Sequence, residues 1–77
     1  MTNEQRAALY GFLISIIGFA AAEEWLHAIV ANNDNLGSIK FLNAKNISVG
    51  PAAELTGRFL NLTQDDLNQI IEISGWD

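Results

Sequence analysis

The 77-residue sequence contains no cysteine, so neither a disulfide framework nor a cysteine-based zinc site can stabilise the fold. A chain of this length forms one small core, which by itself gives little net stability. Small domains that lack disulfides and metal sites are commonly stabilised by oligomerisation. We therefore expect a single domain over residues 1–77 that belongs to a homo-oligomer.

Basic residues are also scarce, and they form no run. The chain has four of them against nine acidic residues, and its formal net charge is -5. Such a balance repels phosphate backbones and suits a basic protein surface. Residues 51–60 and 64–74 form two expected helices joined by a short turn, as in a helix-turn-helix, but the second contains no basic residue. We therefore predict no direct contact with nucleic acid.

The acidic residues of this last expected helix are candidates for contact with a basic partner. They are Asp65, Asp66 and Glu72. Asp65 and Asp66 also lie in the first turn, where the helix dipole favours negative charge. Adjacent residues at a helix start point to different sides, so this pair is not expected to perform acid–base catalysis.

Charged residues make up only 17% of the chain, whereas 49% is hydrophobic. Small proteins have much surface and little interior, so this proportion is high for a small soluble domain. Part of the apolar surface is therefore expected to meet a partner protein.

The most apolar stretch, residues 9–30, reads as one long helix with hydrophobic residues on most of its circumference. Its apolar run ends at Glu23 and Glu24 and is shorter than the roughly 20 residues that span a bilayer. Insertion of residues 8–22 into a membrane is the alternative hypothesis. Ala20-Ala21-Ala22 before Glu23 also resembles a signal-peptide cleavage site, as in an exported protein, although the start of the chain is weakly basic. We favour a helix buried in a core, in a cytoplasmic protein.

Small residues recur along one face of this helix, at Gly11, Ser15, Gly18 and Ala22. Their 4-3-4 spacing places them on one side of a continuous helix. A glycine inside a helix costs roughly 1 kcal/mol relative to alanine, and close approach of another backbone is the usual compensation. The pattern predicts a helix-packing seam, filled either by this chain or by a second copy.

The rest of the chain indicates further helices. Residues 32–35 form a turn, and residues 36–49 are expected to be helical, with a short hairpin near 39–49 as the alternative. A helix follows Pro51, with Leu55 and Phe59 facing inward, and Thr63 with Asp66 forms a capping box for the next helix. Gly75 ends it, and Trp76 is expected to fold back on the last turn. The predicted fold is all-α, with three to four helices and the N-terminal helix the longest.

Chemistry-bearing residues form only one pattern with ligand-like spacing. Glu24 and His27 lie three apart on a helix, as in di-metal carboxylate bundles, but the chain has no second such pair. We expect a solvated surface pair, no metal and no other cofactor. The lone histidine also has no serine at a recognised catalytic spacing, so we expect no enzymatic activity.

These observations favour a small acidic protein that acts by binding another protein. An inhibitor or adaptor of the kind carried by phages, other mobile elements or bacteria fits the size and charge. A membrane-associated or exported protein is the competing hypothesis, and a di-metal protein is a remote third.

Overall fold

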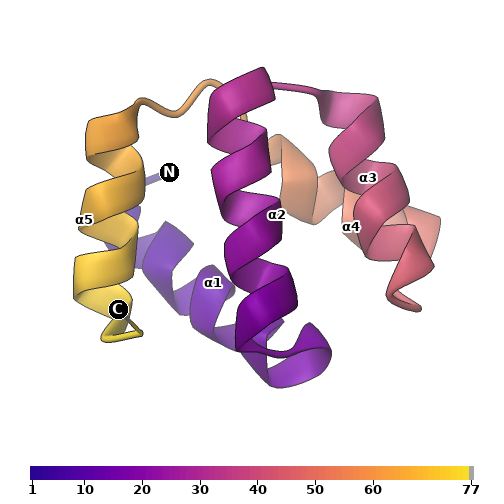
Figure 1. Cartoon of the computed structure of the whole chain (residues 1–77), viewed down its shortest axis with the longest axis horizontal. Coiled ribbons are helices and arrows are strands. Elements are labelled where there is room, and N and C mark those ends of the chain that lie inside the picture. The colour runs from indigo at the N-terminus through magenta and orange to yellow at the C-terminus, as the bar shows by residue number, and fades with distance from the viewer. Residues whose placement is uncertain (77) are drawn as a thin grey trace.

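The computed structural model describes residues 1–76, and this part of the chain contains five helices and no strand (Figure 1). The helices are α1 (Asn3–Ile17), α2 (Phe19–Asn32), α3 (Asn35–Ala44), α4 (Val49–Gly57) and α5 (Gln64–Ser74). The all-α prediction is confirmed. The expectation of three to four helices is too low by at least one, and residues 39–49 form no hairpin.

The predicted long N-terminal helix is in fact two helices that meet at one residue. Gly18 has φ 91° and ψ 158°, a backbone conformation that essentially only glycine adopts. Its amide still donates to the carbonyl of Ile14, and its carbonyl accepts from the amide of Ala22. The hydrogen-bond ladders of α1 and α2 therefore both reach Gly18, and the chain reverses there without a loop.

Local capping signals define most of the other helix ends. Thr2 and Gln5 form a capping box at α1, and Thr63 and Asp66 form the predicted one at α5. The side chain of Asp34 caps α3 by accepting from the amide of Gly37. The α2 and α5 helices both end in left-handed residues, Asn33 and Gly75.

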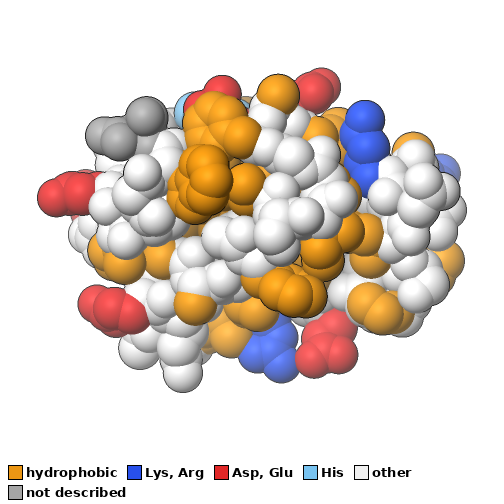
Figure 2. Space-filling view, turned by 90° about the horizontal axis from the view of Figure 1, so that it is seen from below, with side chains coloured by type: hydrophobic (Ala, Val, Ile, Leu, Met, Phe, Trp, Pro, Cys, Tyr) orange, Lys and Arg blue, Asp and Glu red, His pale blue; other side chains and the backbone are white. Residues whose placement is uncertain are grey.

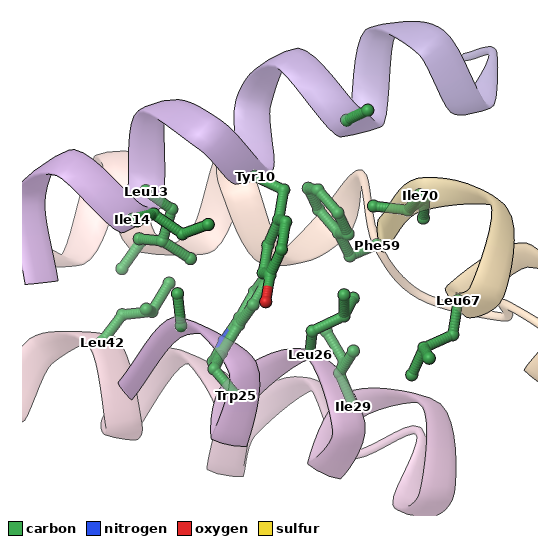
Figure 3. Packing of buried hydrophobic residues seen from close by; sticks show 13 residues of the cluster. Tyr10, Leu13, Ile14, Trp25, Leu26, Ile29, Leu42, Phe59, Leu67 and Ile70 are labelled. Carbon is green, nitrogen blue, oxygen red and sulfur yellow. The ribbon is translucent and has the colours of Figure 1, made fainter. Parts of the chain in front are cut away.

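The helices pack in two pairs around α2. Helix α5 packs against α1, and α3 packs against α4, while α2 contacts α1, α3 and α5 (Figure 1). Figure 3 shows buried side chains of α1 pointing towards those of α2, with Phe59 next to Tyr10 and the α5 residues Leu67 and Ile70 at the side. The largest fully buried side chains are those of Trp25, Tyr10, Phe59, Leu13, Leu26, Ile29, Leu42, Leu67 and Ile70.

Two aromatic residues, Phe59 and Trp76, have surroundings that differ from those expected from the sequence. Helix α4 ends at Gly57, so Phe59 lies in the following turn, yet it is fully buried and packs edge-on against Trp25 with ring centroids 5.1 Å apart. The ring of Trp76 was expected on the last turn of α5. It stacks instead on Phe19 of α2, with centroids 6.0 Å apart.

Residues 8–22, the segment proposed above for membrane insertion, are divided between α1 and α2. Within residues 1–76, no helix has both the length and the hydropathy that crossing a membrane requires. Several of these residues instead supply core side chains, among them Tyr10, Leu13 and Ile14.

Candidate functional site

The surface of α1 carries hydrophobic side chains on the side away from the core. The buried face of α1 is formed by Ala7, Tyr10 and Ile14, together with Leu13. On another face, Phe12 and Ile16 lie one turn apart and are 63% and 51% exposed. A helix that is apolar around most of its axis must expose part of that surface when only one side packs. The consequence is a hydrophobic strip on the molecular surface.

This strip borders an open groove of about 250 Å³. Helix α1 contributes Leu9, Phe12, Leu13 and Ile16 to its lining. The opposite wall is formed by Pro51 and Leu55 of α4 and by Ile47, which precedes that helix. We call these residues, with Glu54 and Arg58, the α1/α4 groove. Figure 2 shows the molecule from below the view of Figure 1, with hydrophobic side chains across the middle of this face and most charged side chains towards its edges.

One ion pair supplies the charge of the groove lining. The guanidinium Nη2 of Arg58 lies 3.0 Å from Oε1 of Glu54, one helical turn away, and both side chains remain exposed to solvent. An exposed pair of this kind stabilises a fold by less than about 1 kcal/mol. The Arg58 carbonyl accepts from Nε of Arg6, which ties α1 to the end of α4. The groove therefore has an apolar lining with one acid and one base at its edge.

The four residues of the predicted small-residue seam do not share one helix face. Gly11 and Ser15 belong to α1, Ala22 is buried in α2, and Gly18 is the junction between the two helices. A methyl group built on Gly11 or Gly18 would have no atom within 4 Å, apart from chain neighbours and local helix backbone. No other helix within residues 1–76 therefore packs closely on either glycine. A second copy at the seam stays a prediction.

The predicted acidic contact residues have different surroundings. Asp66 accepts hydrogen bonds from the Thr63 amide at 3.0 Å and from Nδ2 of Asn3 at 3.1 Å. Chiefly because of the Thr63 amide, with help from the Asn3 and Thr63 side chains, the pKa of Asp66 is lowered. Its carboxylate thus caps α5 and ties it to α1. Asp65 accepts from Gln69 at 3.1 Å and, like Glu72, is exposed.

The weak metal-ligand candidates both lie on the outside of α2. Glu24 and His27 are exposed. In the part of the chain that the structure describes, no three histidine, aspartate or glutamate side chains come together as a potential metal site. Both side chains therefore face solvent.

Sequence reasoning missed the residues that form the groove. The sequence pattern places Phe12 and Ile16 in a helix that is expected to be buried, and it predicts no joint role for Glu54 and Arg58. The four-residue spacing of Ala8, Phe12 and Ile16 is the signal that marks a second apolar face on α1. That spacing does not reveal which of the two faces is buried, because both are apolar.

The fold and groove define a small all-helical protein with an apolar surface depression. Comparison of the chain with models of protein families, with curated proteins and with solved structures found no match.

Proposed function

We propose that this chain is a small non-enzymatic protein that binds an apolar segment of a protein chain in the α1/α4 groove. The observation that carries the proposal is an open, mostly apolar depression with Phe12 and Ile16 half or more exposed at its side. Binding sites combine such an apolar centre with a few polar groups at the rim, and here Glu54 and Arg58 supply that rim.

The expected driving force is removal of this surface from water. Burial of apolar area contributes roughly 25 cal/mol per Å², and a fully buried Phe or Ile side chain contributes about 1.5–3 kcal/mol. Phe12 and Ile16 are already partly covered in the free protein, so binding can add only the remaining part of this contribution for each side chain. Aromatic residues in the centre of an interface commonly dominate its energy. Phe12 is therefore the expected anchor.

An inhibitor or adaptor acting in the cytoplasm is the biological role that we assign to this binding. Such proteins work by occupying a surface of their target and need no catalytic residues. The acidic exterior outside the groove, with Asp65 and Glu72 exposed on α5, supports a separate contact with a basic surface of such a target.

Site-specific photo-crosslinking tests the proposal. A benzoylphenylalanine placed at Phe12, in cells that naturally produce the protein, is expected to form one discrete protein adduct. Leu55→Asp, which places a charge in the apolar wall, should abolish that adduct. The matched control carries the same crosslinker at Asn68, an exposed position on α5. Absence of an adduct from position 12, or equal adducts from both positions, would overturn the proposal.

A further inference from the structure

We infer that the protein segment bound in the α1/α4 groove is α1 of a second copy, so that two chains form a two-fold symmetric dimer with Phe12 of each inserted in the groove of the other. This inference rests on the proposed function of the groove as a protein-binding site. It specifies the partner and the geometry, and it places the contact on a different face from the glycine seam.

The first support is that the protruding side chain and the cavity belong to the same patch. In a two-fold interface each subunit presents the same surface, so a projecting group and its receiving cavity must both lie on it. Phe12 is the most exposed large hydrophobic residue among residues 1–76, and it also lines the groove. An apolar cavity of about 150 Å³ accommodates benzene. The groove, at about 250 Å³, has room for a phenyl ring.

The second support is the distribution of charge. The groove lining contains one acidic and one basic residue, Glu54 and Arg58, so its formal charge is zero. The whole net charge of -5 therefore resides on other residues. Two copies that approach through faces carrying the acidic excess repel each other, whereas two grooves meet without net repulsion. Across a two-fold axis, Glu54 of each copy faces Arg58 of the other.

The third support is the extent of the patch along α1. A second depression, lined by Met1, Gln5, Ala8 and Leu9, shares Glu54 and Arg58 with the groove. The two depressions together follow α1 from its start at Asn3 to Ile16, a distance of roughly 20 Å at 1.5 Å per residue. Contact along one helix of this length is small beside standard interfaces, so we expect a weak, concentration-dependent dimer.

Sedimentation equilibrium of the purified full chain, from micromolar to millimolar concentration, measures this association. The wild type is expected to change from monomer to dimer mass within this range. Phe12→Gln should weaken dimerisation by roughly tenfold or more, because the anchor loses its apolar burial. Circular dichroism of the variant should show an unchanged fold, since Phe12 makes no part of the buried core.

A charge-exchange experiment identifies the geometry. Glu54→Arg alone and Arg58→Glu alone each place like charges opposite one another in a symmetric dimer, and each should weaken it. An equimolar mixture of the two variants should recover dimers, since each charge then meets its opposite across the interface. Neither variant can regain the ion pair within its own chain, so recovery is diagnostic. Asn68→Arg, on exposed α5, serves as the control and should leave dimerisation unchanged.

Three outcomes would overturn the inference. The first is a wild type that stays monomeric up to millimolar concentration, and the second is a dimer that neither Phe12→Gln nor the charge variants affect. The third is a dimer abolished by Gly11→Leu but not by Phe12→Gln, which would place the contact on the seam. A crosslinked adduct with a different protein at position 12, from a chain that is monomeric in solution, would retain the proposed function and reject the second copy.

Discussion

At the scale of single residues, two glycines of the N-terminal segment have opposite roles. Gly18 needs a backbone conformation that side-chain-bearing residues rarely adopt, and Gly11 lies inside α1 with open space beside it. The cost of Gly11 in the helix thus has no compensating contact within the described chain. Glycine is required at position 18 because of its backbone conformation, and not because a neighbouring helix packs closely on it.

We predict opposite effects for the same substitution at these positions. Gly18→Ala should lower the free energy of unfolding by about 1–3 kcal/mol, because the alanine is strained at φ 91°. Gly11→Ala should raise it by about 0.5–1 kcal/mol, through better helix propensity. Urea unfolding of both variants measures the difference. Equal destabilisation by the two would contradict this assignment and indicate close packing at Gly11.

Tyr10 gives a prediction for alkaline pH. Burial, and secondarily the nearby carboxylate of Glu23, raises the pKa of Tyr10 from 10.0 to about 12. At a pH between these two pKa values, the Tyr10 hydroxyl keeps its proton in the folded protein, whereas in the unfolded chain it has released it. The stabilising contribution is therefore complete below pH 10 and is lost as the pH rises towards 12, by about 3 kcal/mol in total.

Comparison of the wild type with Tyr10→Phe isolates the effect of ionising the Tyr10 hydroxyl. The Tyr10 hydroxyl is buried without a hydrogen-bond partner among residues 1–76, so removing it should not destabilise the protein at neutral pH. Denaturant unfolding at several alkaline pH values should show a steeper loss in the wild type than in the variant. Parallel curves for the two proteins would refute the prediction, because all other titrating groups are common to both.

At the scale of elements, the caps of α4 and α5 form a natural pair for comparison. Thr63 caps α5 by accepting from the Asp66 amide at 3.1 Å, whereas Ser48 at the start of α4 makes no side-chain capping bond. Thr63→Ala should lower the free energy of unfolding by about 1 kcal/mol. Ser48→Ala should change the free energy of unfolding by only about a few tenths of a kcal/mol. Thermal unfolding of both variants measures the two losses of stability. A larger loss for Ser48→Ala than for Thr63→Ala would contradict the cap assignment.

The pairing of elements explains why α1 has both a core face and a binding face. Helix α5 and helix α2 cover one part of its circumference, and α4 stands on the far side of the groove. Asn3 donates to Asp66 and Gln69 of α5, so the α1–α5 pair is fixed at its start by polar contacts. This arrangement leaves Phe12 and Ile16 outside the contact with α2.

At the scale of the whole molecule, two phenylalanines distinguish the core from the surface patch. Phe59 is fully buried against Trp25, so Phe59→Ala should lower the free energy of unfolding by about 3–5 kcal/mol. Phe12→Ala removes a ring that is 63% exposed and should cost less than about 1 kcal/mol in the monomer. Chemical unfolding at low concentration, where the monomer predominates, measures both. A large loss for Phe12→Ala there would show that the ring supports the fold itself.

The bounds of the last helix were predictable from the sequence, whereas the break at Gly18 and the ends of α3 and α4 were not. The Thr63–Asp66 box and the Gly75 stop both lie where local patterns placed them. Of the groove residues, the sequence pattern singles out Pro51 as a helix start and Leu55 as facing inward with Phe59. Phe59 is buried as expected, while Leu55 is partly covered and lines the groove.

The sequence by itself determined the helical class, the caps and the excess of apolar surface, because these depend on interactions within a few residues or on composition. Only the tertiary structure decided that the chain reverses at Gly18 and that Phe12 and Ile16 remain outside. A helix with apolar residues on most sides has no intrinsic inner face. The face that becomes the core is the one on which α2 and α5 pack, and the remaining face becomes the candidate binding surface.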